Sequence, residues 1–283
     1  MDKPCLNCGC KKSIKYGLRH CKKGLVQIYF CKVCNRRFTP KDGFRRMKHD
    51  KRIITMTLDM YAKGMSLRGI AHHLKMFYDI RISHAGVLYW IQRYGSLIKE
   101  YTLTLKPQLS ERWYADETLL MFNNRKNWLW NIMDAKTRFW LGDTVSLFRH
   151  QKDANNAFQI IKTLPQLAPS VLETDGAAHY RQAALTAFPN IQHYVYSKPE
   201  DKNKMQIMER LNGNIKQRTK TMRGLHCART CRKQMDFLQG YYNFIRPHAA
   251  LNSATPADFA KVSVCRGGNK WEALITKAAE KVI

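Results

Sequence analysis

Apolar residues recur at helical spacing between residues 50 and 97, and this pattern predicts three short helices. The second and third helices span about 67–76 and 84–94. Ser66 and Ser83 precede them, at positions where a hydroxyl caps the first free backbone N–H groups. Three short capped helices suit a helix-turn-helix, whose last helix enters the DNA major groove, although a plain three-helix packing unit would show the same pattern.

The apolar pattern becomes strand-like after Trp113 and then alternates between strand and helix. The predicted strands are 113–122, 128–134, 139–147, 170–174 and 191–196, and the predicted helices are 153–164, 177–188 and 201–222. Three successive strands followed by alternating helix and strand indicate a mixed α/β sheet covered by helices. This is the element order of a ribonuclease-H-like core. A last short helix is predicted over 271–281.

The first 45 residues contain two Cys-x-x-Cys pairs. Cys5 and Cys8 form one pair, and Cys31 and Cys34 form the other, directly after the strand-like run 25–30. Each pair can supply two thiolates from one tight turn, and two such turns close a tetrahedral site. We therefore predict one structural Zn²⁺ in a zinc ribbon, whose small core needs the metal to fold.

The net charge of the chain bears on its binding partner. The 283 residues carry 49 Lys and Arg against 21 Asp and Glu, a net charge of +28. The excess concentrates in residues 1–52 and 202–233, and Glu209 is the only acid of the second cluster. Such an excess indicates a polyanionic partner, of which nucleic acid is the usual one.

No run approaches the roughly 20 apolar residues of a membrane span. The N-terminus also lacks the apolar core of a secretory signal. We therefore expect no membrane partner and a cytoplasmic location, nucleoid-associated in a prokaryote.

Three carboxylates occupy settings that suit metal-dependent chemistry. Asp116 lies within the first strand of the mixed sheet, Asp175 follows the fourth, and Glu209 lies on the last long helix. Such a trio can hold two Mg²⁺ (or Mn²⁺) ions about 3.5–4 Å apart over a phosphodiester. Glu209 shares a helical face with Asn212 and Lys216, which places a cation beside the acid. Other nearby acids are expected to be mostly solvated, namely Glu117, Asp134, Asp143, Glu173 and Asp201.

The fold class predicted from these patterns is α/β, a ribonuclease-H-like mixed-sheet catalytic core preceded by a small zinc ribbon and a helical (helix-turn-helix) DNA-binding module. The predicted boundaries are 1–45 for the zinc ribbon, 46–98 for the helical module, 99–112 for a linker, 113–262 for the catalytic domain and 263–283 for a C-terminal tail.

Four short motifs resemble those of DDE-type insertion-sequence transposases, closest to the IS-six group and its archaeal relatives. They are Ala115-Asp116-Glu117-Thr118, Thr174-Asp175-Gly176, Glu209-Arg210-x-Asn212-x-x-Ile215-Lys216-x-Arg218 and Tyr242-Asn243-x-x-Arg246-Pro247-His248. The resemblance implies that Asp116, Asp175 and Glu209 are the catalytic, metal-binding triad. It also implies two-metal phosphoryl transfer, a homodimer or higher multimer on terminal inverted repeats, and cleavage and strand transfer of double-stranded DNA.

Further basic and polar residues are predicted to contact DNA. Lys216 is expected to lie near the active site, and the remaining candidates come from the ribbon, the third helix, the Glu209 motif and the tail motif: Arg36, Arg37, Gln92, Arg93, Arg210, Asn212, Arg218, Arg246 and His248. For the tail motif, simple packing of a last helix is an equal alternative.

Two other functions remain open on the sequence. A non-catalytic regulator needs only the ribbon and the helices, and the intact triad argues against it. A structure-specific nuclease on the same fold would cut junctions or hybrids without joining ends.

Overall fold

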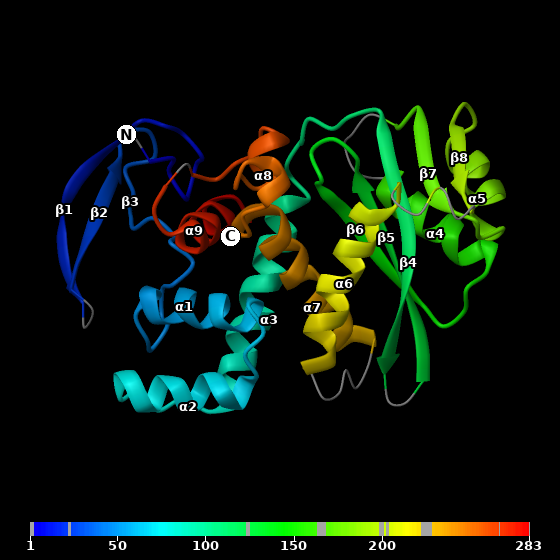
Figure 1. Ribbon diagram of the computed structural model, residues 1–283. Helices are drawn as coiled ribbons and strands as arrows, with labels where there is room; N and C mark the ends of the chain where they lie inside the picture. The colour runs from blue at the N-terminus through cyan, green and yellow to red at the C-terminus, as the bar shows by residue number, and fades with distance from the viewer. Residues whose placement is uncertain are drawn as a thin grey trace.

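The structure is a computed structural model. It describes residues 3–21, 24–122, 125–162, 168–197, 201, 204–221, 228–265 and 267–282. Figure 1 shows a small sheet at the N-terminus, a group of helices beside it and a larger, helix-covered sheet on the far side.

The N-terminal segment folds into a small antiparallel sheet. Its strands are β1 (Ser13–Cys21), β2 (Gly24–Cys31) and β3 (Arg37–Phe38). The predicted strand 25–30 lies within β2. This segment has its own small core, made by Cys5, Cys31 and Phe38. So little buried apolar surface cannot hold a fold alone, which agrees with a need for metal.

Three helices follow, as predicted: α1 (Lys51–Ala62), α2 (Leu67–Tyr78) and α3 (His84–Thr102). The predicted caps are confirmed, because the Ser66 and Ser83 hydroxyls accept hydrogen bonds from the N–H groups of Gly69 and Gly86. α3 continues well past its predicted end near Tyr94.

The larger sheet contains β4 (Arg112–Phe122), β5 (Arg125–Asp134), β6 (Trp140–Ser146), β7 (Val171–Asp175) and β8 (Gln192–Tyr196). The strand order is β6-β5-β4-β7-β8. The first three strands pair antiparallel, and β7 joins β4 and β8 in parallel. This arrangement is the predicted ribonuclease-H-like core.

Helices cover both faces of this sheet. α4 (Gln151–Lys162) and α5 (His179–Ala187) lie on one face, and α6 (Gln206–Thr221) and α7 (Ala228–Gly240) lie between the sheet and α3 (Figure 1). Gly142 of β6 permits the close approach of α4, because a Cβ there would stand 2.5 Å from the Cδ1 atom of Ile161.

The C-terminal part returns to the first helices. After a π-helical turn (Tyr241–Ile245), a 3-10 turn (Ala249–Leu251) and α8 (Pro256–Phe259), α9 (Lys270–Val282) packs against α1 and α3. Trp271 of α9 stacks on Phe237 of α7, with ring centroids 5.3 Å apart, and its Nε1 donates to Asp59 of α1.

One continuous core therefore joins the first helices, the sheet and α9. The burial of Ile98 and Tyr101 in this core explains why α3 continues to Thr102. In the part of the chain that the structure describes, no helix is both long enough and apolar enough to cross a membrane.

Candidate active site

Asp116 and Asp175 meet at the centre of the sheet because their strands are parallel neighbours. β4 pairs with β7 through Trp113 with Leu172 and Tyr114 with Glu173, and the same register carried two residues further sets Asp116 beside Asp175. Their carboxylate oxygens, with one from Glu117, all lie within 4.8 Å of one another. Such clustered oxygens fit a hard divalent cation.

Burial and mutual repulsion prepare Asp116 for a cation. Desolvation, together with the negative charges of Glu117 and Asp175, raises the pKa of its carboxyl to about 7 against the opposing charge of Arg149. A bound cation would reverse this cost, because an opposite charge nearby favours the ionised form.

Glu117 is the carboxylate that sequence reasoning missed. It was expected to be solvated, but only 8% of it is exposed. Tyr180 Oη donates to its carboxylate, and His179 Nε2 lies 3.4 Å away. Burial raises the pKa of Glu117, but these two contacts and the charge of Arg149 outweigh burial and leave the pKa below its ordinary value.

Arg149 supplies the positive charge of the cluster. Its guanidinium bonds Glu117, lies 3.6 Å from an Asp175 oxygen and covers the Trp128 ring at 4.9 Å from the centroid. No sequence motif marked this arginine, which precedes α4 and reaches the acids only through the fold. Arg149 stabilises the ionised form of Glu117, whereas the pKa of Asp116 stays raised.

A chain of amides holds Asp116 from the α6 side. Asn212 Nδ2 donates to Asp116 Oδ2 at 2.6 Å, and Asn131 Nδ2 donates to Asn212 Oδ1 at 2.7 Å. Asn131 stands opposite Asp116 on one side and Asp143 on the other, so a polar row crosses three strands. Asn131 Oδ1 and both Asp143 oxygens are buried without a hydrogen-bond partner among the described residues.

Glu209 lies on α6 one turn before Asn212, and its side chain is exposed. Within the described part of the chain, the compact carboxylate cluster includes Asp116, Glu117 and Asp175 and does not include Glu209. Its role as the third acid therefore stays a prediction. Lys216 and Arg210 of the same helix are exposed, as a DNA contact requires.

The comparison with protein-family models agrees with this geometry. Residues 110–246 match the family model of the DDE domain of IS240-type transposases. This segment matches a DDE domain. The matched segment contains every strand of the larger sheet and all of α6, and with them Asp116, Asp175 and Glu209.

The solved structures that match part of this chain include viral integrases. A chain of the simian T-cell lymphotropic virus intasome, in complex with PP2A regulatory subunit B56 gamma, matches 55% of this chain at 18% identity with a TM-score of 0.44. This chain covers 56% of that one. Two structures of the HTLV-2 integrase catalytic core domain with magnesium, trimeric and dimeric, match 55% of this chain at 18% and 17% identity, with TM-scores of 0.40.

The matches cover 98% of each integrase core. The comparison with curated proteins finds no match.

Three further acids of the matched segment are buried, contrary to expectation. Asp134, Asp143 and Glu173 are at most 3% exposed. Asp134 accepts four hydrogen bonds from Ser110 and Thr137, and Glu173 pairs with Arg112 at 2.6 Å. Asp134 fixes a turn and Glu173 forms an ion pair, and the sequence spacing did not reveal these partners, whereas Asp143 is buried without a hydrogen-bond partner among the described residues.

Three of the residues predicted to contact DNA point into the protein. Arg218 is 4% exposed, with its guanidinium 3.8 Å from the Tyr61 ring centroid and 3.2 Å from the carbonyl of Met65. Asn212 is buried, and its side-chain amide donates a hydrogen bond to Asp116. His248 bonds the carbonyl of Tyr242, and burial lowers its pKa to about 4, so it is neutral at pH 7. Their polar groups are engaged within the protein, and their contact with DNA stays a prediction.

The remaining candidates for DNA contact are accessible. Arg36, Arg37 and Arg93 are exposed, and Gln92 and Arg246 are half-buried. Arg37 lies over the Tyr16 ring at 4.0 Å from its centroid. The core alternative holds for the aromatic part of the tail motif, because Tyr242 and Phe244 are buried.

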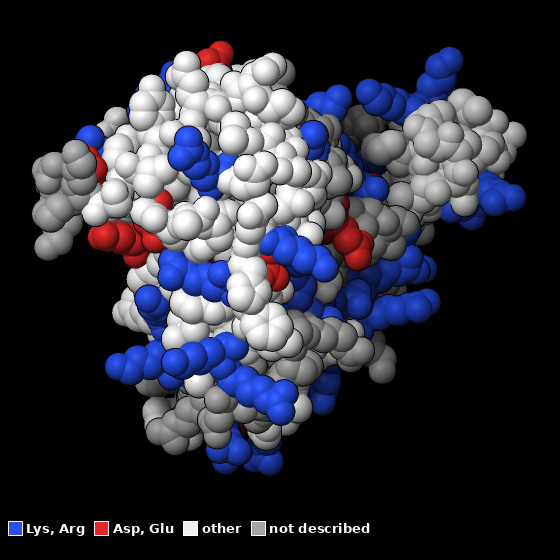
Figure 2. Space-filling model, turned by 90° about the vertical axis from the view of Figure 1, so that its right-hand side faces the viewer, with Lys and Arg blue, Asp and Glu red and all other residues white. Residues whose placement is uncertain are grey.

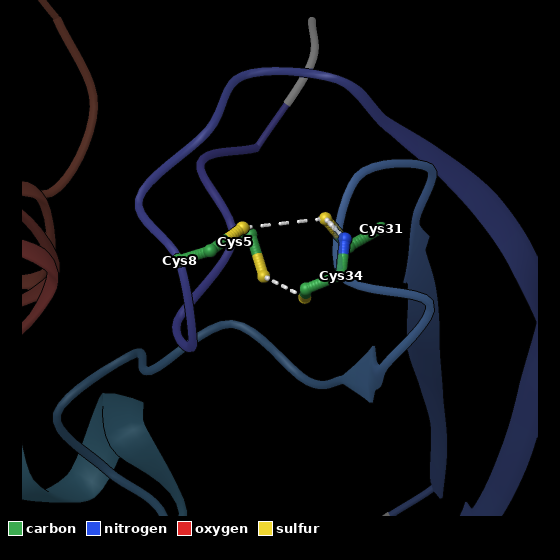
Figure 3. Close-up of side chains that lie close together, drawn as sticks. All are labelled: Cys5, Cys8, Cys31 and Cys34. Atoms are coloured by element: carbon green, nitrogen blue, oxygen red, sulfur yellow. Dashed lines mark hydrogen bonds between the residues drawn. The ribbon is translucent and has the colours of Figure 1, made fainter.

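The four predicted cysteines form the second candidate metal site. Figure 3 shows Cys5 and Cys8 facing Cys31 and Cys34 across the two turns. The sulfur atoms of Cys5 and Cys34 are 3.5 Å apart, and those of Cys8 and Cys31 are 3.6 Å apart. Four sulfurs at about 2.3 Å from a tetrahedral zinc would be about 3.8 Å apart, so these thiols fit the ion.

Backbone N–H groups prepare these sulfurs for metal. The N–H groups of Val33 and Cys34 point at the Cys31 sulfur, each at 3.4 Å. The hydrogen bond from Cys34 is the main cause that lowers the pKa of Cys31 to about 6, against the opposing effect of burial. A fifth thiol, Cys10, lies 3.2 Å from the Cys31 sulfur and outside the set of four.

Proposed function

We propose that this protein is an insertion-sequence transposase that cuts and joins DNA strands at the ends of its element. The observation that carries the proposal is the convergence of Asp116 and Asp175 inside a matched DDE domain. Hard divalent cations, Mg²⁺ or Mn²⁺, suit these oxygen ligands, and two such ions can activate the attacking oxygen and stabilise the leaving one.

Each protein group has a proposed role at this site. Asp116 and Asp175 would hold the cations, and Glu209 would complete the set from the exposed face of α6. Asn212 keeps Asp116 aimed at the cluster through its 2.6 Å hydrogen bond. Arg210 and Lys216 would position the DNA backbone beside Glu209, as charged side chains do at phosphates.

The proposed domain division assigns recognition to the N-terminal part. Two modules would bind double-stranded DNA at the element ends: the ribbon of residues 1–45, with one structural Zn²⁺, and the helices of 46–98. The contacts would come from Arg36, Arg37, Gln92 and Arg93. Figure 2 shows the opposite side of the molecule, the side of the larger sheet, where basic side chains gather over the lower half and acidic ones are few. This distribution favours a polyanionic partner.

The catalytic domain would span 113–262, after a linker of 99–112, and 263–283 would form the tail. A homodimer or higher multimer would pair two element ends, and a DNA target places the protein at the nucleoid. The integrase structures described above are dimeric, trimeric or part of an intasome, as their names state, and the assembly of this chain is a proposal.

A strand-transfer assay tests the function. Duplex oligonucleotides from the DNA that flanks this reading frame are incubated with the full-length protein, Mg²⁺ and a target plasmid. We expect nicking at the element end and joined products with the wild type, and neither with Asp175→Ala. Specific binding without cutting would support a regulator, and cutting only of junctions or hybrids would support a nuclease. Undiminished joining by Asp175→Ala would refute the proposed site.

A further inference from the structure

A cavity of about 510 Å³ lies beside α6, on the side away from the carboxylates. Leu211, Asn214 and Gln217 line it, whereas Asn212 and Glu209 lie on the opposite part of the helix circumference. Its other walls come from the turn between α1 and α2 and from the end of α7 with the π-helical turn. The cavity therefore lies where the first helices meet the DDE domain, a common place for ligand sites, which measure about 300–1,000 Å³.

Aromatic rings form part of the cavity wall. Trp140 and Tyr242 are buried and meet edge to face with centroids 6.0 Å apart. Tyr241 is half-buried and rests on Trp271, their planes 11° apart. Tyr241 is therefore the ring with a free surface, which suits a flat ring as ligand, and the buried Trp140 and Tyr242 form the wall behind it.

The charged lining of the cavity is cationic. Lys63, Arg218 and Arg246 line it, and no acidic residue does so among the described residues. Arg218 is held over Tyr61, and Lys63 pairs with Asp59 outside the lining at 2.6 Å. Asn214 and Gln217 add amides that can both donate and accept hydrogen bonds. Flat apolar surface, positive charge and amides together match a nucleobase that carries a phosphate.

We propose that this cavity binds one nucleotide, with the base on the aromatic wall and the phosphate at Arg246 and Lys63. Building on the proposed function, the nucleotide belongs to an unpaired position of the bound DNA. DNA that contacts both the turn between α1 and α2 and the exposed face of α6 would pass beside the cavity. A paired base cannot enter, so the nucleotide must leave the stack, and ring stacking offsets that loss.

The test compares two labelled duplexes by fluorescence anisotropy, with full-length protein and no added Mg²⁺. One duplex is fully paired, and the other has the same sequence with one unpaired nucleotide. We expect the wild type to bind the second about tenfold more tightly. Gln217→Trp, which places an indole at the cavity, should remove this preference and change binding of the paired duplex less than twofold. Gln217→Glu should weaken the preference through charge repulsion.

Gln159→Trp is the matched control, because Gln159 is an exposed helical glutamine on α4, across the sheet. It should leave both affinities unchanged. Equal binding of the two duplexes by the wild type, or a preference that survives in both Gln217 variants, would overturn the nucleotide site. Melting curves of each variant establish that the fold is retained.

Competition with free dAMP tests whether the cavity takes its nucleotide from the DNA strand or from solution. It also distinguishes failure of the nucleotide site from failure of the proposed function. We expect dAMP to compete with the duplex that has the unpaired nucleotide and not with the paired one. Binding of dAMP without such competition overturns the DNA strand as source. If the wild type binds neither duplex, the proposed function fails. Loss of dAMP binding in Gln217→Trp would then still support the cavity as a nucleotide site, and retained binding would overturn it.

Discussion

The cysteine cluster and the carboxylate cluster are built in opposite ways. Two short turns supply all four thiols, and a separate small core surrounds them. The carboxylates come from two strands that are 59 positions apart in the sequence, and an asparagine and an arginine from other elements hold them. The cysteine cluster depends on nearby residues and on bound metal for its structure. The carboxylate cluster is positioned by the packing of the whole domain and should persist without metal.

Loss of a carboxylate should give the largest effect. Asp116→Asn and Asp175→Asn each remove a ligand charge, so metal-dependent strand cleavage should fall by more than about 100-fold, since changes around metal ligands alone cost about 10–100-fold. Gel assays of cleavage at several Mg²⁺ concentrations measure this loss. Zinc content, measured by atomic absorption, should stay at one per chain. A fall in zinc content would contradict the independence of the two clusters.

Removal of zinc should unfold the N-terminal sheet and spare the larger one. Cys31→Ser, or chelation, removes a site that in isolated zinc-binding peptides contributes about 10–16 kcal/mol of apparent binding energy. Hydrogen exchange should therefore rise in β1, β2 and β3 and stay slow in β4, β5 and β7. Cys265→Ser is the matched control, since Cys265 lies outside the cluster. Faster exchange throughout the chain would show that the two cores are not separate.

The amide that holds Asp116 should have an intermediate effect. Asn212→Ala removes the hydrogen bond to Asp116 and leaves Asn131 without its partner, so cleavage or apparent Mg²⁺ affinity should fall about 10–100-fold. Asn156→Ala, at an exposed asparagine of α4, is the control and should retain cleavage. Equal activity of Asn212→Ala and wild type would mean that the strand alone positions Asp116.

The smallest effect concerns pH and the stability of the protein without divalent metal. Burial and the nearby charges of Glu117 and Asp175 raise the pKa of Asp116 to about 7, whereas an aspartate in an unfolded chain titrates near 3.9. Between about pH 4 and about pH 7, Asp116 therefore holds a proton in the folded protein that it loses in the unfolded chain. The stability of the folded protein therefore falls as pH rises from about 4 to 7, by at most about 1.4 kcal/mol per pH unit.

Urea unfolding at several pH values measures this slope, and Asp116→Asn should flatten it. An unchanged slope in the variant would assign the effect to other groups.

The sequence predicted the features that depend on local spacing. Alternation and helical period located the strands and helices, Ser66 and Ser83 located two helix starts, and paired cysteines located the thiol cluster. Asp116 and Asp175 were also found, because strand order implies which strands become neighbours. Each of these inferences needs only a few adjacent residues or a known order of elements.

Features that depend on packing between distant elements were not predictable. Glu117 was taken as solvated, because its partners Tyr180 and His179 come from α5. Arg218 was assigned to DNA, because the charge of an arginine does not reveal that Tyr61 will cover it. The end of α3 was missed for the same reason, since its last turns are stabilised by α7 and α9.

The two contacts of α6 have a thermodynamic consequence. Asn212 holds Asp116 at one point of the helix, and Arg218 holds the Met65 carbonyl of the turn between α1 and α2 at another. Six residues of helix separate them, a rigid span of about 9 Å. A ligand that moves this turn therefore also moves the amide that aims Asp116. Linkage is reciprocal, so occupancy of the carboxylates would change affinity at the turn by the same factor.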